Sequence, residues 1–210
     1  VDIDEIVVEM CKKHMPEWGA GAADDPRAEI IYDDANAWLE RYEGKFDVLI
    51  MDISDPLECG PGVVMYTQEF YQNVAAHKLH EGGVFVTQSG GLGDVTVHDC
   101  FPPIHNTLKT AFTTVLPYYQ SVGSFSGEWG WNVAFNEGPT SPLAMTPEAV
   151  DAAIAARIEG GDSALRMYDG QAHLGMFNLP KQIRKAIAAN KRIITKANPE
   201  AAFDHKGANE

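Results

Sequence analysis

The stretch FDVLIMDISDP, residues 46–56, joins an apolar run to two carboxylates, Asp52 and Asp55. The apolar run predicts a buried strand, and the proline- and glycine-containing residues 56–62 predict a loop after it. In an open α/β sheet, ligands bind in the crevice beyond the carboxyl ends of the strands. Two acids there can hold a cationic amine and accept a proton from it. Taken in isolation, the motif is explained as well by a turn at Asp55, with Asp52 as a helix cap or a solvated loop acid.

The composition is that of a soluble globular protein with one domain, and its formal charge of −14 argues against a nucleic-acid partner. No apolar run approaches the ~18 residues of a membrane span, and there is no signal-peptide pattern, so we expect no membrane partner and a cytoplasmic location. Three scattered cysteines (Cys11, Cys59 and Cys100) fit neither a disulfide framework nor a zinc site. The histidines show no metal-ligand spacing either, and no metal site is expected.

Strands and helices alternate along the predicted chain. Strands are expected over residues 1–4, 28–32, 46–51, 84–88, 118–123 and 130–135. Helices are expected over residues 6–14, 38–42, 68–78, 104–115 and 180–189, and from Pro147 onward. This alternation is typical of βαβ units with a mostly parallel sheet, and the last two strands suggest a mixed edge. The polar segment from residue 191 is expected to be frayed.

Acidic residues follow two other predicted strands. Asp2 and Asp34 are expected on the same sheet edge as Asp52. In nucleotide-binding α/β folds, an acid at the end of the second strand commonly accepts hydrogen bonds from ribose hydroxyls. Either acid alone could be a helix cap. Acids at three successive strand ends favour a nucleoside site.

Several uncharged residues are further candidates. Gln88 ends a predicted strand before a glycine-rich loop, whose spacing matches neither a dinucleotide fingerprint nor a P-loop and which could be a flexible connector. Tyr66 could line a pocket or belong to the core. An aromatic cluster, equally compatible with core packing and with the apolar wall of a pocket, contains Phe125, Trp129 and Trp131.

A collinear series of motifs resembles the spermidine synthase family of aminopropyltransferases. It consists of Asp2-Ile3-Asp4, Asp24-Asp25-Pro26-Arg27, Asp33-Asp34, residues 46–56, Phe70-Tyr71, Tyr168-Asp169-Gly170 and residues 177–180. Within the family, other motifs are more similar to the thermospermine synthase branch, namely residues 86–90, 104–108, 122–126 and 129–131. Residues 1–190 are therefore identified as a partial catalytic domain, followed by a polar C-terminal tail over residues 191–210.

The resemblance implies an α/β, Rossmann-like (methyltransferase-like) fold, with a mostly parallel sheet and helices on both faces. Relative to the family, we expect the chain to lack the first strand with its glycine-rich loop, and the N-terminal β-hairpin domain. The first strand is central in this sheet, and its absence leaves buried backbone groups unpaired. We therefore expect the 210-residue chain alone to fold poorly and to be inactive.

The resemblance also implies a reaction. The family transfers an aminopropyl group from decarboxylated S-adenosylmethionine, a co-substrate, to a polyamine, without a cofactor. Carried over by position, the resemblance implies that Asp52 accepts the proton of the attacking amine. It implies that Asp2 binds the ribose of the donor and Asp34 its adenine. The residues implied to bind the amines of the polyamine are Asp55, Tyr66, Gln88, Phe125 and Trp129.

Phe125 stands where spermidine synthases have a tyrosine, which favours spermidine as acceptor and thermospermine as product. The alternatives are a spermidine or spermine synthase of the same family, a methyltransferase on the same sheet, and a non-catalytic remnant that binds polyamine or nucleoside. The full-length protein is expected to be a homo-oligomer.

Overall fold

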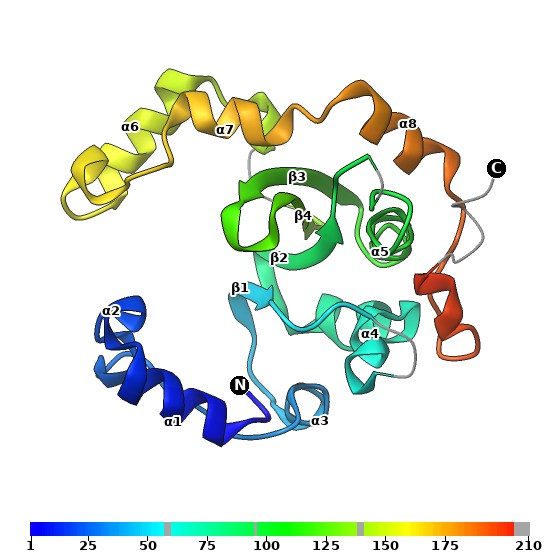
Figure 1. The fold of residues 1–210 in the computed structure, drawn as a ribbon, viewed down its shortest axis with the longest axis horizontal. Helices are drawn as coiled ribbons and strands as arrows, with labels where there is room; N and C mark the ends of the chain where they lie inside the picture. Colours follow the sequence, from blue (N-terminus) through cyan, green and yellow to red (C-terminus); the bar gives the residue numbers. More distant parts are fainter. Residues whose placement is uncertain (57–59, 95, 138–140, 204–210) are drawn as a thin grey trace. The chain divides into compact units, whose positions relative to one another are not determined.

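The computed structural model describes residues 1–56, 60–94, 96–137 and 141–203. Cys59 and the end of the expected polar tail, residues 204–210, lie outside the described residues. The chain forms two compact units, Val1–Gly44 and Lys45–Glu210 (Figure 1).

The first unit consists of short helices and one strand bridge. Helix α1 (Glu5–His14) is followed by α2 (Pro16–Gly19), the 3-10 turn η1 (Ala22–Asp24) and α3 (Ala35–Arg41). Where the sequence predicts two strands, the structure has one parallel bridge between Asp2 and Tyr32. The prediction of full strands is wrong here, because within this unit each segment pairs only with the other, and two-stranded pairing is marginal in water.

The second unit contains a four-stranded sheet. Its strands are β1 (Phe46–Met51), β2 (Leu79–Gly91), β3 (Thr114–Val122) and β4 (Gly127–Phe135), in the spatial order β1-β2-β4-β3 (Figure 1). β1 and β2 are parallel, whereas β2–β4 and β4–β3 are antiparallel. The sheet is therefore mixed rather than mostly parallel.

Strand β1 lies at an edge of this sheet, and the prediction that it is buried is wrong for most of its residues. Val48 is 53% exposed and Ile50 is 67% exposed, whereas Met51 at the end of the strand is 4% exposed. The physical reason is that β2 is the single neighbour of β1 in the four-stranded sheet.

The register defines the two faces of the sheet, because directly paired residues carry their side chains on the same face. Thr87 pairs with Asn132, and Asn132 pairs with Pro117. On this face, Asn132 is fully buried and its Oδ1 lies 2.7 Å from Nδ1 of His105 in helix α5 (Phe101–Leu108). The opposite face of the sheet carries the neighbouring row of paired residues, Gln88, Trp131 and Tyr118, and with it the candidate site.

Several helices differ from the predicted bounds. The helix predicted over residues 68–78 divides into α4 (Gln68–Asn73) and the 3-10 turn η3 (Ala75–Lys78), and β2 begins at once after it. The helix predicted over residues 104–115 is displaced toward the N-terminus, as α5, because β3 already begins at Thr114. β3 accommodates Pro117 since it is an edge strand, where a missing backbone N–H costs little.

The C-terminal part of this unit is mostly helical. Helix α6 (Pro147–Arg157) begins as predicted, with the Thr146 hydroxyl accepting from the backbone N–H of Ala149 at 3.2 Å. Helix α7 (Gly170–Phe177) is not predicted, and α8 (Lys181–Ala189) agrees with the prediction. The remaining 3-10 turns are η2 (Pro61–Tyr66), η4 (Gly123–Phe125), η5 (Pro142–Ala144), η6 (Gly161–Ala164) and η7 (Pro199–Ala202).

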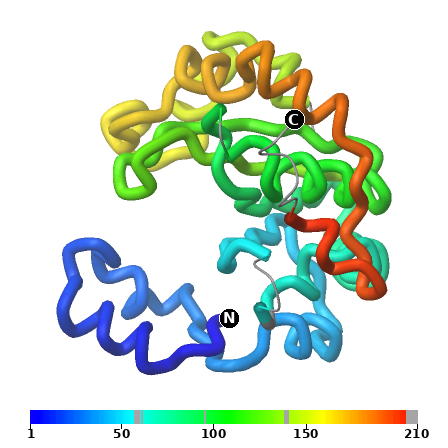
Figure 2. The backbone as a smooth tube through the Cα atoms, turned by 45° about the vertical axis from the view of Figure 1, so that its right-hand side comes forward, coloured from blue at the N-terminus to red at the C-terminus, as the bar shows by residue number. Residues whose placement is uncertain are grey.

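The segment after α8 is packed, so the expectation that it frays from residue 191 is wrong for the residues described. Ile194 is fully buried; its N–H donates to Thr107 Oγ1 at 2.9 Å, and its carbonyl accepts from the N–H of Gln68 at 2.8 Å. Figure 2 shows this red segment returning beside the cyan part of the chain. A buried isoleucine and two long-range backbone bonds hold a segment whose composition is mostly polar.

None of the helices in the described parts of the chain is long and apolar enough to cross a membrane.

Candidate active site

The side-chain amide of Gln88 is the centre of the candidate site. Gln88 lies near the end of β2 and is 5% exposed. Its Nε2 is 2.9 Å from Asp55 Oδ1, 2.8 Å from the Tyr66 hydroxyl and 2.8 Å from the carbonyl oxygen of Ile53. The amide thus links β2 to the acidic loop that follows β1.

The other end of the same amide is also occupied. Gln88 Oε1 accepts from the backbone N–H of Gly90 at 3.0 Å and from the indole Nε1–H of Trp129 at 3.1 Å. Both partners are donors only, so the oxygen must face them and the nitrogen must face the acids. The orientation of the amide is therefore determined by its surroundings.

Tyr66 contacts the same acidic loop through its hydroxyl group. Its side chain is fully buried, and its hydroxyl lies 3.2 Å from the carbonyl oxygen of Ser54 and 3.3 Å from that of Ile53. Burial, and then the negative charge of Asp55, raise the pKa of Tyr66 well above its ordinary value. The phenol is therefore neutral at physiological pH, and it positions the backbone between the two carboxylates.

The two carboxylates differ in environment. Asp52 follows the last residue of β1 and is exposed, whereas Asp55 is half-buried and bound to Gln88. An exposed carboxylate can receive a proton from a ligand, and a fixed one can hold a cationic group. The structure thus adds a buried amide that holds one of the two acids, and the binding and proton-accepting roles of both remain predictions.

The prediction that a glycine-rich loop follows Gln88 directly is wrong, because β2 continues to Gly91 and its last two glycines are closely packed. Gly90 has φ +90°, and a Cβ there would collide with Sγ of Cys100. The Cys100 thiol donates to the carbonyl oxygen of Ser89 at 3.4 Å. Burial, and then the charge of Asp55, raise the pKa of Cys100, so the thiol stays protonated and packs as a small apolar group.

The aromatic cluster is divided between packing and exposure. The rings of Phe125 and Trp129 lie 4.5 Å apart, with Phe125 56% exposed. Trp131 stacks instead on Tyr118 of β3, with 5.7 Å between the ring centroids. Trp129 therefore links two parts of the candidate site, since it contacts the exposed ring of Phe125 and donates to the amide of Gln88.

The two acids expected to bind the donor belong to the first unit. Asp2 Oδ1 accepts from the N–H of Asp4 at 2.9 Å, and the carbonyl oxygen of Asp2 accepts from the N–H of Asp33 at 2.9 Å. Asp34 caps α3, its Oδ1 accepting from the N–H of Ala37 at 3.0 Å. The bridge at Tyr32 thus brings the two predicted donor-binding acids onto neighbouring segments, and their binding roles remain predictions.

Comparison with known proteins identifies the family of this chain. Residues 1–142 match the family described as "Spermine/spermidine synthase domain". The chain belongs to the spermine/spermidine synthase family. A polyamine aminopropyltransferase from Synechococcus sp. (strain JA-3-3Ab) is 39% identical over 95% of this chain, and polyamine aminopropyltransferase 2 of Hyperthermus butylicus is 38% identical over 95%. The chain spans 62% and 63% of the lengths of these two relatives.

Solved structures of spermidine synthases share the fold. One in complex with the transition-state analogue AdoDATO matches with a TM-score of 0.73 and 26% identity over 90% of this chain and 60% of that one. The spermidine synthase of Thermotoga maritima matches with a TM-score of 0.70 and 25% identity, also over 90% of this chain. The predicted α/β, Rossmann-like, methyltransferase-like fold class is confirmed, with a mixed sheet.

Two features of the second unit were not predicted from the sequence. One is Tyr118, which lies in register with Trp131 and, through it, with Gln88. The other is helix α7, whose Phe177 ring packs 5.3 Å from that of Tyr118. The clue for α7 was available, because Asp169 precedes it and caps it, accepting from the N–H of Ala172 at 2.7 Å. No local signal distinguishes Tyr118 from its neighbour Tyr119.

In the parts of the chain that the structure describes, no three histidine, cysteine, aspartate or glutamate side chains are grouped so as to hold a metal ion.

Proposed function

We propose that the full-length protein transfers an aminopropyl group from decarboxylated S-adenosylmethionine to an amine of a polyamine, and that the reaction converts spermidine to thermospermine. The observation that carries the proposal is the pair of acids after β1, one exposed and one held by Gln88. Membership of the spermine/spermidine synthase family supports it.

The proposed chemistry needs a base rather than a covalent nucleophile. The sulfonium of the donor already activates its propyl carbon, so the amine nitrogen attacks that carbon, the C–S bond breaks, and the electron pair stays on sulfur as a neutral thioether. An amine with a pKa near ~10 is mostly protonated at neutral pH and must lose a proton before it attacks. We assign that proton to Asp52, which is exposed where β1 ends.

The remaining residues would hold the two substrates. Asp55, fixed by Gln88 Nε2 at 2.9 Å, would bind a second, charged amine of the acceptor. Phe125 and Trp129 would cover its methylene groups. Asp2 would bind the ribose hydroxyls of the donor, and Asp34 its adenine amino group.

The assignment of thermospermine rests on Phe125. A phenyl ring offers no hydroxyl where spermidine synthases have a tyrosine, and this favours a longer acceptor than putrescine. The 56% exposure of Phe125 supports this assignment, because an exposed ring is open to contact with a ligand.

Product analysis with full-length protein tests the proposal. The protein is incubated with decarboxylated S-adenosylmethionine and either putrescine, spermidine or no acceptor, and the products are separated by chromatography against standards. Thermospermine from spermidine is expected. Spermine, an isomer extended at the other end of spermidine, or spermidine from putrescine would replace the assigned product while keeping the reaction class. Absence of any transfer by a protein that still binds polyamine would support a non-catalytic binding protein.

A further inference from the structure

One row of side chains crosses the sheet at the level of the candidate site. Gln88 of β2 is paired with Trp131 of β4, and Trp131 is paired with Tyr118 of β3. At the other edge, Met51, the last residue of β1, is paired with Thr87, and Asp52 is the next residue along the chain. Paired side chains share a face, and the row therefore presents an amide, an indole and a phenol on one side of the sheet.

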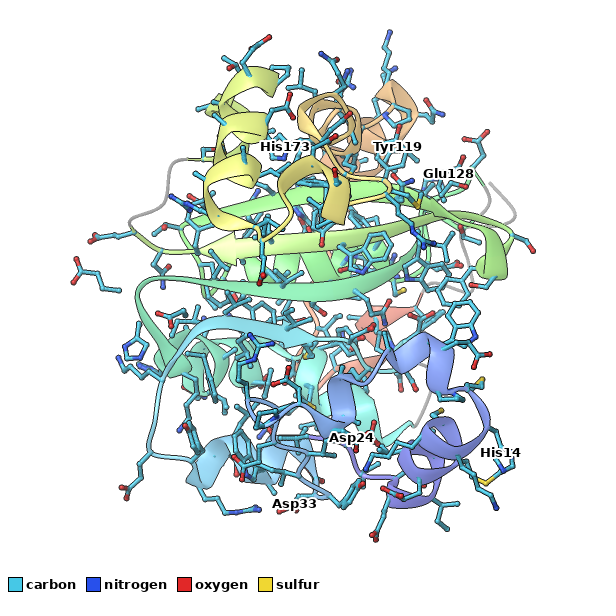
Figure 3. All side chains as sticks on the ribbon, turned by 90° about the vertical axis from the view of Figure 1, so that its left-hand side faces the viewer. His14, Asp24, Asp33, Tyr119, Glu128 and His173 are labelled. Carbon is cyan, nitrogen blue, oxygen red and sulfur yellow. The ribbon has the colours of Figure 1, made fainter. Side chains whose placement is uncertain are left out.

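The phenol at the end of this row is firmly placed. The Tyr118 ring stacks on Trp131 at 5.7 Å and packs against Phe177 of α7 at 5.3 Å. Phe177 in turn lies 5.0 Å from the ring of His173, which is labelled in Figure 3. His173 is buried; its Nδ1 accepts from the Tyr168 hydroxyl at 2.8 Å, since its Nε2 donates to the carbonyl oxygen of Pro142 at 2.9 Å. These contacts tie Tyr118 to α7 and leave its ring little freedom.

The hydroxyl group of Tyr118, by contrast, forms no hydrogen bond to any other residue that the structure describes, and the neighbouring Tyr168 hydroxyl bonds to His173 instead. Burial, and then the neighbouring Tyr168 and Asp52, raise the pKa of Tyr118 to about 12. This phenol therefore stays neutral at physiological pH. A neutral phenol can accept a hydrogen bond from an ammonium group and donate one to a carboxylate.

This placement matches the chemistry of an extended chain that carries amines at intervals. We propose that Tyr118 is a further acceptor-binding residue: its hydroxyl holds an amine of the polyamine other than the one next to Asp52, and its ring lines the intervening methylene groups. The inference rests on the proposed function, because it takes a polyamine as the ligand. It adds a residue on β3 to a set that otherwise comes from the loop after β1, from η2 and η4, and from β2 and β4.

Substitution of Tyr118 by phenylalanine tests the inference in full-length protein. Tyr118→Phe removes the hydroxyl and keeps the ring, its stacking on Trp131 and its contact with Phe177. We expect the Kd for spermidine, measured by isothermal titration calorimetry, to rise about tenfold, since a hydrogen bond to a charged group is lost. The KM for spermidine should rise in parallel, while kcat and the binding of methylthioadenosine, the nucleoside product, stay unchanged.

The neighbouring Tyr119 supplies the matched control. Tyr119 is paired with Gly130 on the opposite face and packs against the buried cluster of Leu92, Val97, Phe101, Leu179, Ile183 and Ala186. Tyr119→Phe should leave spermidine binding unchanged. Equal spermidine affinity for Tyr118→Phe and wild type, or equal losses in both variants, would overturn the inference. If wild type binds spermidine and Tyr118→Phe loses affinity but neither transfers an aminopropyl group, the proposed function fails and the inference stands. If wild type does not bind spermidine, both fail.

Discussion

Gln88 Nε2 lies 2.9 Å from Asp55 Oδ1, across 33 residues of sequence, and thereby fixes a carboxylate of the loop after β1 to the end of β2. The amide that does this is 5% exposed and bound at both ends. The hydrogen bond from this buried amide holds the carboxylate of Asp55 in one position. The neighbouring Asp52, which is exposed, remains available to a ligand.

Replacing Asp52 should separate proton transfer from binding. Asp52→Asn keeps the shape of the side chain but cannot accept a proton, so turnover should fall about 10²–10⁴-fold, the range of general-base contributions. Donor binding, measured by calorimetry, should survive. Asp47→Asn, which replaces an exposed acid of the preceding strand β1, is the control and should retain turnover. Retained turnover in Asp52→Asn would remove Asp52 from the role of base.

Removing the Gln88 amide should affect both stability and acceptor binding. Gln88→Ala removes the amide donor of Asp55 and the acceptor of the Gly90 N–H and the Trp129 indole, which should lower the free energy of unfolding by about 1–3 kcal/mol. The KM for the polyamine should rise, because Asp55 is no longer held. Denaturant unfolding and steady-state kinetics measure the two effects.

Gln72→Ala is the matched control for Gln88→Ala. Gln72 is exposed on α4, and its Nε2 donates to the carbonyl oxygen of Thr110 at 3.0 Å. Its removal should change the free energy of unfolding by less than about 0.5 kcal/mol, as for most surface positions. Equal effects of the two substitutions would show that the Gln88 network contributes nothing specific.

Helix α7 offers a paired test of its packing on α6. A Cβ on Gly170 would collide with the carbonyl oxygen of Pro147, whereas a Cβ on Gly175 would meet nothing within 4 Å. Gly170→Ala should therefore lower the free energy of unfolding by about 1–3 kcal/mol. Gly175→Ala should be neutral or stabilising by up to about 1 kcal/mol, because alanine favours helix. A thermal melt that ranks the two variants in the reverse order would contradict this packing.

The buried His105 should make stability depend on pH. Burial lowers the pKa of His105 below its ordinary value of 6.5, Lys109 adds to the lowering, and the bond to Asn132 opposes it. Just below that value the unfolded chain binds more protons than the folded one, so the free energy of unfolding should fall as the pH falls. Urea unfolding above and below pH 6.5 measures the slope.

His105→Asn removes the titrating group and should flatten this slope, whatever its effect on stability at neutral pH. His80→Gln replaces an exposed histidine and should leave the slope as in wild type. An unchanged slope in His105→Asn would assign the pH dependence to other groups.

Much of the local structure could be predicted from the sequence. Thr146 begins α6 and Thr67 begins α4, each by accepting a hydrogen bond from a backbone N–H three residues later. A helix cap depends only on residues within one turn of the helix, so it can be predicted from a few neighbouring residues. The acids after β1 were recognisable for the same reason, since an apolar run followed by carboxylates is a local pattern.

The sheet could not be predicted in the same way. Whether β2 pairs with β1 or with β4, and in which direction, depends on contacts between segments far apart in the chain. Val48 and Ile50 are apolar and yet exposed, because strand order rather than composition decides which strand is at the edge. The packed segment at Ile194 illustrates the converse, as tertiary contacts hold a stretch whose composition predicts fraying.

The sequence by itself thus determined the family, the acidic pair Asp52 and Asp55, and the presence of Gln88 on a strand. Only the tertiary structure decided that Gln88 binds Asp55 and that Tyr118 shares its face of the sheet. The physical reason is that hydrogen bonds and cross-strand register join residues separated by tens of positions. No local pattern specifies such partners until the strands are paired.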